Sequence, residues 1–147
     1  MYGYFPLNDF ESDLKLNPAL KVKARVTLVR EVEKGIGVGY GHLFKTPRKS
    51  KLAVVAIGYA DGVSRTLSGK IFGSIDGVLV PQVGAIAMDQ MVFDITNKPN
   101  IKTGQVLTLL GTDGEVFISP QEWSDLSGSI PWEVLCGFRN RLPRVVT

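Results

Sequence analysis

The sequence predicts a mainly β protein, a closed and Greek-key-like β-barrel with one or two short helices near the C-terminus. Short apolar runs follow one another at close spacing with turn residues between them, a pattern typical of barrels and sandwiches rather than of βαβ folds. Patterns that favour helix appear only after residue 118. The 147 residues suffice for one domain with its own core, and no linker divides them. We therefore expect a single domain over residues 1–147, with residues 1–18 as a lead-in.

The first strand is predicted over residues 20–28. Apolar and polar residues alternate there, which gives one buried and one wet face; the apolar ones are Leu20, Val22, Ala24, Val26 and Leu28. Further strands are predicted over residues 52–57, 70–75, 78–83, 87–95 and 105–110. Two pairs between the runs, Asp76-Gly77 and Asp113-Gly114, are typical of hairpin turns.

One helix is strongly indicated near the C-terminus. Ser119 is a typical N-cap, Pro120 suits the first helical position, and Glu122 stands where a capping box needs an acidic or amide side chain. This helix should run to about Leu126 and end at Gly128. A further turn or two is predicted over residues 131–137, followed by a strand or extended segment over residues 139–144.

Composition narrows the class of protein. Hydrophobic residues make up 44% and charged residues 21%, as in an ordinary soluble domain, and the net charge is +3. The basic run over residues 45–51 lacks interleaved aromatic residues, so we expect a solvated loop rather than a nucleic-acid interface. One cysteine and one histidine, far apart, predict no metal site, and Cys136 is expected to be a buried structural thiol. With neither a signal peptide nor a membrane span in view, we expect a cytoplasmic protein.

The most unusual stretch is residues 35–42, where Tyr40 lies among four glycines. Pattern alone leaves two interpretations about equally open: a glycine-rich hairpin with a half-buried tyrosine at its tip, or a bare surround that lets the backbone approach a partner closely. A phenol is an unusual base, because its ordinary pKa is about 10 and it needs nearby positive charge or donors to ionise. No nucleophile elbow, phosphate loop or dinucleotide fingerprint offers a competing constellation.

Four blocks, taken together and in order, resemble the C-terminal domain of alanine racemases. They are Val38-Gly39-Tyr40-Gly41, Gly58-Tyr59-Ala60-Asp61-Gly62 with Arg65, Ala87-Met88-Asp89-Gln90, and the segment from Gly128 through Trp132 to Arg141-Leu142-Pro143-Arg144. The resemblance covers essentially the whole chain. It implies that residues 1–18 lead in from a preceding barrel that binds pyridoxal phosphate.

The resemblance also implies an activity, the interconversion of L-alanine and D-alanine for peptidoglycan precursor supply. Tyr40 matches one of the two catalytic bases of the family, the other being the cofactor-linked lysine of the barrel. Met88 matches the residue whose backbone N–H binds the substrate carboxylate. In the family these residues complete the active site of the other subunit of a homodimer. We therefore expect the chain to work with its own barrel and with that of a second subunit, and to be inactive alone. No nucleic acid or membrane is expected as a partner.

The family resemblance also implies roles for further residues. Tyr59, Arg65 and Asp89 match residues that line the path by which substrate reaches the active site. Trp132 stands where a tyrosine commonly contacts the cofactor phosphate, and Ala85 where many members have an arginine. For Asp61 we expect a structural role, holding its turn through backbone hydrogen bonds.

Two alternatives remain open from the sequence. The chain could be a free-standing β-barrel that binds a partner without catalysis. It could also belong to a related racemase that acts on another amino acid and differs in the pocket around Met88, Ala85 and Trp132.

Overall fold

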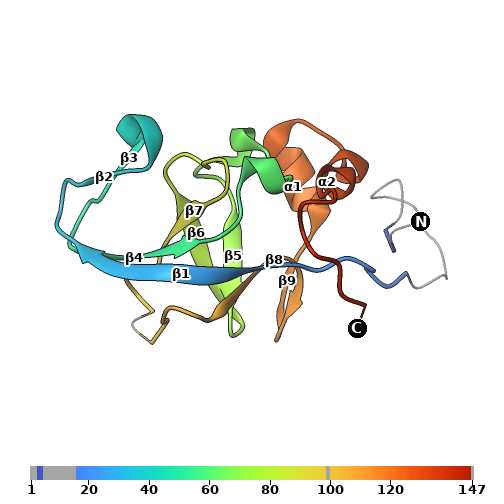
Figure 1. The fold of residues 1–147 in the computed structure, drawn as a ribbon, viewed down its shortest axis with the longest axis horizontal. Helices are drawn as coiled ribbons and strands as arrows, with labels where there is room; N and C mark the ends of the chain where they lie inside the picture. Colours follow the sequence, from blue (N-terminus) through green and yellow to red (C-terminus); the bar gives the residue numbers. More distant parts are fainter. Residues whose placement is uncertain (1–2, 5–15, 99, 147) are drawn as a thin grey trace.

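A closed antiparallel ring of strands forms the body of the protein in the computed structural model, which describes residues 3–4, 16–98 and 100–146 (Figure 1). Neighbouring strands in the ring are β1 (Val22–Val32), β4 (Ser50–Val55), β7 (Met91–Asp94), β6 (Val78–Val83), β5 (Phe72–Ile75) and β8 (Val106–Asp113). Strand β8 pairs back with β1, which closes the ring. Because β4 lies beside β7 while β5, β6 and β7 follow one another, the order is that of a Greek key. The predicted mainly β fold is confirmed.

Strand β1 bends at a bulge and serves two neighbours. Its first half pairs with β8 and its second half with β4, and the register shifts between Val26 and Leu28. The extra residue reverses the alternation of faces, so that Leu28 is 47% exposed whereas Val29 packs against the core. The prediction that Leu28 shares the buried face of Val22 and Val26 is therefore wrong.

Short elements complete the sheet. Strand β9 (Val116–Ile118) pairs only with β8 among the described residues, and β2 (Gly37–Val38) and β3 (Phe44–Lys45) form a small separate hairpin. The β5–β6 turn has positive φ at both Asp76 and Gly77, as the sequence predicts for a tight hairpin. The strand predicted over residues 87–95 begins only at Met91, because residues 87–90 form a loop closed by a hydrogen bond from Ala87 N to Gln90 O.

Two helices cover one end of the ring, α1 (Pro120–Ser127) and α2 (Pro131–Gly137). The predicted capping box of α1 is present, with the Ser119 hydroxyl accepting from Glu122 N, and Gly128 ends the helix at a φ of 71°. Trp123 of α1 is buried in the core with its ring 6.3 Å from that of Phe138. None of the described helices is long and apolar enough to cross a membrane.

Other expectations need correction near the C-terminus. Cys136 is exposed rather than buried, because α2 turns Leu135 and not Cys136 toward the core. Residues 139–144 form a turn and an irregular segment instead of a strand.

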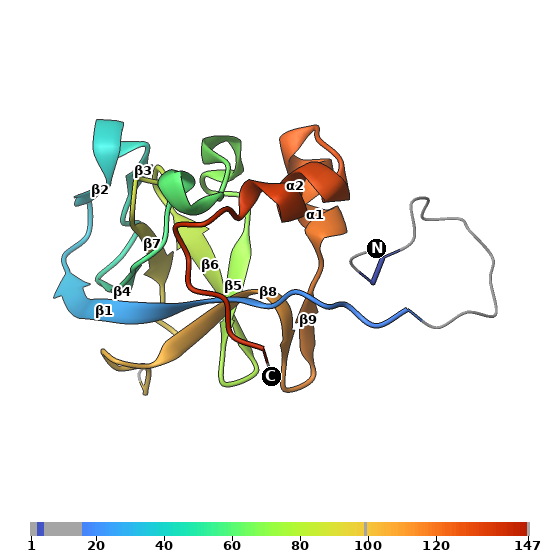
Figure 2. The ribbon, with the colours of Figure 1, turned by 45° about the vertical axis from the view of Figure 1, so that its right-hand side comes forward.

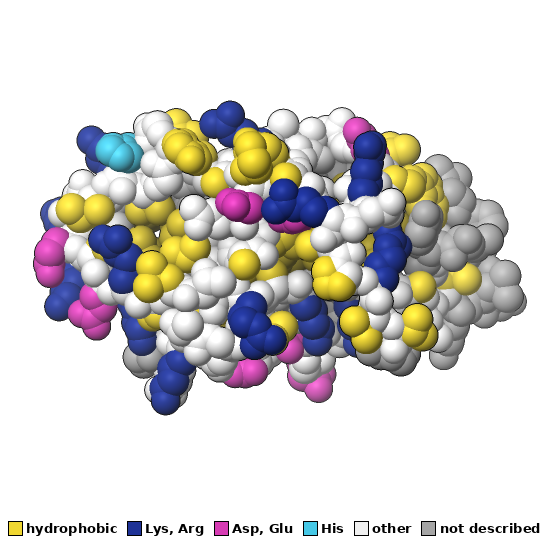
Figure 3. Space-filling view, viewed as in Figure 1, with side chains coloured by type: hydrophobic (Ala, Val, Ile, Leu, Met, Phe, Trp, Pro, Cys, Tyr) yellow, Lys and Arg dark blue, Asp and Glu magenta, His cyan; other side chains and the backbone are white. Residues whose placement is uncertain are grey.

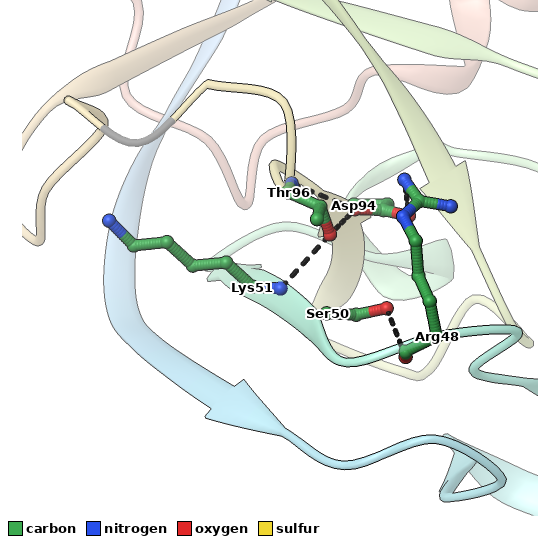
Figure 4. A network of polar contacts seen from close by, with 5 residues as sticks. All are labelled: Arg48, Ser50, Lys51, Asp94 and Thr96. Atoms are coloured by element: carbon green, nitrogen blue, oxygen red, sulfur yellow. Dashed lines mark hydrogen bonds and ion pairs between the residues drawn. The ribbon is translucent and has the colours of Figure 1, made fainter.

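Residues 46–49 of the basic run form a loop, whereas Lys45 ends β3 and residues 50–51 begin β4; ion pairs and hydrogen bonds to acidic side chains hold this region. Arg48 lies 3.8 Å from Asp94, whose carboxylate also accepts from Thr96, and Thr96 in turn accepts from the main-chain N of Lys51 (Figure 4). Lys49 forms an ion pair with Glu31 at 3.2 Å. The loop interpretation therefore holds for residues 46–49 and is wrong for the two ends of the run, which lie in strands.

Candidate functional site

The sequence blocks singled out above gather at one end of the ring. Three short 3-10 turns, η1 (Tyr40–His42), η2 (Tyr59–Asp61) and η3 (Arg65–Leu67), lie at the same end as α1 and α2, whereas the β5–β6 and β8–β9 hairpins point to the opposite end (Figures 1 and 2). The loop between β6 and β7, residues 84–90, joins this group. The positions predicted for the site are thus distributed over η1, η2, η3, this loop and α2; they are Tyr40, Tyr59, Arg65, Met88, Asp89 and Trp132.

The segment that carries Tyr40 packs main chain to main chain on the loop. A Cβ built on Gly84 would lie only 2.7 Å from Val38 O, and one on Gly39 would lie 3.4 Å from Ala85 O. Both glycines have positive φ, so other residues would be strained there even where space allows. The bare surround of Tyr40 therefore permits a close approach between two segments of this chain, an interpretation the sequence left open.

On its other side, the same loop is held by the turn that carries Tyr59. Tyr59 N donates to Ala87 O at 3.0 Å, and Ala60 N donates to Met88 O at 2.9 Å. Gly58 makes this contact possible, because a Cβ there would lie 2.2 Å from Ala87 O. The loop thus lies between the Tyr40 segment and the Tyr59 turn, and all three keep fixed relative positions.

Asp61 holds the Tyr59 turn from within. The residue is 5% exposed, and its carboxylate accepts from Gly58 N at 2.9 Å, which confirms the structural role expected for it. The same carboxylate accepts from Arg141 Nε at 2.8 Å across 80 residues of sequence. Sequence reasoning missed this ion pair, although an aspartate in a glycine-rich apolar setting is itself a sign that a cation lies nearby.

Arg65 and Trp132 flank this arrangement. The Ser68 hydroxyl donates to Arg65 O at 2.6 Å and accepts from Ile86 N at 3.0 Å, so η3 is also tied to the loop. The Arg65 side chain is exposed, and Trp132 is half-buried in the first turn of α2. Ala85, by contrast, is 4% exposed and offers its methyl group to the interior, not to solvent.

The chemistry-bearing groups at this end face outward. Tyr40 is 71% exposed, Met88 54% and Tyr59 43%, with exposed Leu43 and Ile130 among them. Figure 3 shows hydrophobic side chains along this edge of the molecule, interspersed with acidic and basic ones. The half-buried tyrosine of the hairpin interpretation is therefore wrong, although the hairpin itself is present.

Two polar groups at this face have no hydrogen-bond partner among the residues that the structure describes. Among the described residues, no atom forms a hydrogen bond with the Tyr40 hydroxyl or accepts one from the Met88 N–H, while the Met88 carbonyl is engaged by Ala60. The described residues contain no cluster of three or more potential metal ligands.

A cavity of about 370 Å³ lies beside this face, between η3 and the two helices. It is lined by residues such as Thr66, Trp123 and Glu133, and by none of the six predicted site residues. The candidate site is therefore an open face and not this cavity.

Comparison with known proteins defines the class first. The fold matches solved structures of alanine racemases: that of Bacillus anthracis with bound L-Ala-P has a TM-score of 0.88 at 34% identity, covering 94% of this chain and 36% of that one. That of Bartonella henselae with covalently bound pyridoxal phosphate has a TM-score of 0.86 at 34% identity, covering 98% and 39%. The family described as alanine racemase, C-terminal domain, matches residues 19–146, and the chain belongs to this family.

The curated relatives are also named alanine racemases, and their lengths show how much of such a protein this chain covers. The alanine racemase of Prochlorococcus marinus is 60% identical over 146 residues, and that of Nostoc sp. is 46% identical over 145 residues. In each case the match covers 99% of this chain but only 38% of the relative. The chain therefore spans less than two-fifths of the length of the relatives it matches.

Proposed function

We propose that this chain is the C-terminal domain of a pyridoxal-phosphate-dependent alanine racemase and supplies one face of an active site that a barrel completes. The observation that carries the proposal is the main-chain linkage of three segments, which presents the Tyr40 phenol and the Met88 N–H outward from one end of the protein. Relatives that match nearly the whole chain are named alanine racemases, which favours alanine over another amino acid.

Racemisation requires a proton to leave the α-carbon on one face and another to return on the opposite face. Two bases on opposite sides meet this need, and general acid–base groups of this kind contribute about 10²–10⁴-fold each. Tyr40 is proposed as one of them, with its phenol oxygen taking or giving the proton. The second base is proposed to come from the barrel.

Substrate binding is assigned to the loop of residues 84–90. The Met88 N–H is a donor without an acceptor among the described residues, and a carboxylate oxygen is the kind of acceptor it lacks. Tyr59 on the adjoining turn, with Arg65 and Asp89, would line the approach and limit the size of the substrate side chain.

Pyridoxal phosphate, when bound, acts as an electron sink that makes the α-proton of an amino acid removable. Trp132 fits a minor part in holding it, since an indole N–H is a donor of the kind a phosphate oxygen accepts. The covalent attachment and most of the phosphate contacts are proposed to lie in the barrel.

The Tyr40 phenol also needs help from outside the chain. A phenol becomes a useful base only beside positive charge or hydrogen-bond donors, and the described residues give its hydroxyl no hydrogen bond. We therefore propose that the barrel of a second subunit in a homodimer covers this face and supplies those groups. The activity would provide D-alanine for peptidoglycan precursors.

The test is to measure alanine racemisation by the full-length enzyme with Tyr40→Phe. A matched control is Tyr4→Phe, which removes a buried hydroxyl that has no partner among the described residues. Tyr40→Phe should lower racemisation at least a hundredfold. In deuterated water it should still let one enantiomer exchange its α-proton without inversion, because the opposite base remains. Racemisation that survives Tyr40→Phe, or that falls equally in Tyr4→Phe, would contradict the proposal.

A further inference from the structure

We propose that Arg141 is a positioning residue for the substrate-binding amide of Met88, acting through Asp61 and the turn that carries Tyr59. The inference rests on the proposed function, because it assumes that the Met88 N–H binds the substrate carboxylate. It assigns a role in substrate binding to the C-terminal segment, which leaves α2 and passes close to the candidate face (Figure 2).

The first link is the ion pair. Arg141 Nε lies 2.8 Å from Asp61 Oδ1, and the aspartate side chain is 6% exposed while the arginine is 53% exposed. A buried carboxylate without a cation is costly, so loss of Arg141 would favour a turn of the Asp61 side chain toward water. The C-terminal segment is held in place for this contact by Arg144, which donates to Phe138 O at 2.8 Å.

The second link runs from Asp61 to the loop. The other oxygen of the carboxylate accepts from Gly58 N, and the next two amides, those of Tyr59 and Ala60, donate to the carbonyls of Ala87 and Met88. Four hydrogen bonds thus connect Arg141 with the peptide unit beside the Met88 N–H. The first two pass through the side chains of Arg141 and Asp61, and the last two join main chain to main chain.

The turn has little freedom to absorb a disturbance. On one side Gly58 touches the loop so closely that a Cβ would lie 2.2 Å from Ala87 O, and on the other a Cβ on Gly62 would lie 2.5 Å from Gly137 O. A shift of Asp61 therefore passes to the loop or to the end of α2. Tyr40 belongs to a different segment, which contacts the loop at Gly84 and Ala85.

Because the linkage from Arg141 reaches Met88 and not the segment of Tyr40, it should affect substrate binding more than proton transfer. Removing Arg141 should weaken the hold on the substrate carboxylate, which acts equally before and during proton transfer, and so raise KM more than it lowers kcat. A merely structural role would lower the amount of folded enzyme and leave KM unchanged.

The test uses Arg141→Leu in the full-length enzyme, with Arg139→Leu as the matched control. Arg139 is exposed, lies two residues away, and forms no ion pair among the described residues. We expect Arg141→Leu to raise the KM for alanine roughly tenfold, with kcat changed less than threefold. Arg141→Lys should recover part of that loss, since it keeps the charge but not the guanidinium geometry.

A second arm tests the linkage in this chain without any activity. Amide NMR signals of Tyr59, Ala60 and Met88 should shift in Arg141→Leu and stay in place in Arg139→Leu. Should Arg141→Leu fail to fold, Arg141→Lys takes its place in both arms, with smaller shifts in the same direction.

The outcomes separate the two proposals. A wild-type enzyme that does not racemise alanine refutes the proposed function, and the NMR arm still decides the linkage. An active wild type with an unchanged KM in Arg141→Leu, or with a loss confined to kcat, overturns the positioning role. Unshifted signals at Met88 overturn it as well.

Discussion

Replacing Gly58 by alanine tests the close approach on which the candidate face depends. The backbone at Gly58 is extended, with a φ of −156°, so alanine meets no conformational strain there. The obstacle is steric, because the new methyl group would lie 2.2 Å from Ala87 O and 2.6 Å from both the carbonyl carbon and oxygen of Met88. All of these are main-chain atoms and cannot rotate away as a side chain could.

The expected loss of unfolding free energy follows from the contacts that the new methyl group disrupts. Relief of the clash requires the loop to withdraw, which weakens the hydrogen bonds from Tyr59 N to Ala87 O and from Ala60 N to Met88 O. Each such bond contributes about 1 kcal/mol net, and overpacking adds about 1–3 kcal/mol. The reduced entropy of the unfolded chain returns about 0.4–1 kcal/mol. Gly58→Ala should therefore lower the free energy of unfolding by about 2 to 4 kcal/mol.

Urea unfolding of this chain, followed by tryptophan fluorescence, measures the change. The control is Gly35→Ala, where a Cβ would meet nothing within 4 Å but φ is 82°, so that only backbone strain of about 1 kcal/mol is expected. If Gly58→Ala unfolds no more easily than Gly35→Ala, the loop does not press on the turn as described.

Three further outcomes are expected. Burial raises the pKa of Asp113, but hydrogen bonds from Ser74 and Gly77 and the nearby Lys23 outweigh it and hold the pKa below its ordinary 3.8. Since the folded pKa is the lower one, this carboxylate stabilises the fold above about pH 4 and ceases to do so as pH falls through the folded pKa. Asp113→Asn should lower the unfolding free energy at pH 7, and the gap to wild type should narrow in acid; a constant gap would contradict the assignment. Ser119→Ala should cost about 1 kcal/mol of unfolding free energy by removing the N-cap of α1, whereas Ser119→Asp should cost less. Cys136 should react with a thiol reagent in the native chain nearly as fast as in denaturant, and strong protection would restore the buried thiol that the sequence suggested.

What the sequence predicted well depends on neighbours along the chain. The Asp76-Gly77 turn fixes positive φ at two adjacent residues, and the strand after it has the predicted bounds, Val78–Val83. The capping box of α1 likewise needs only Ser119 and Glu122, three residues apart. Local steric and hydrogen-bonding preferences decide such features, so pattern reading finds them.

The features that the sequence did not predict depend on contacts between segments that are distant in the chain. The bulge in β1 exists because one strand must pair with both β8 and β4, and nothing within residues 20–28 reveals that demand. The exposure of Cys136 follows from which side of α2 meets the core. For the candidate site, family resemblance picked out residues on segments that do lie together, while their roles stay predictions. The glycine contacts and the pair of Asp61 with Arg141 emerged only from the structure.

The exposure of the candidate face follows from the physical chemistry of the groups it carries. In the roles proposed for Tyr40 and Met88, a phenol that exchanges protons and an amide N–H that binds a carboxylate both work best away from water. Burying either one without a partner would cost about 1–3 kcal/mol, and within the described residues neither has one. Under the proposed function, the chain leaves both groups in solvent until a partner surface covers them and supplies complementary charge. The chain alone can fix the relative position of the phenol and the amide, and the main-chain contacts at Gly58 and Gly84 hold them in place. The open face is thus the form expected of a domain that supplies geometry to a site whose charge is proposed to come from a partner.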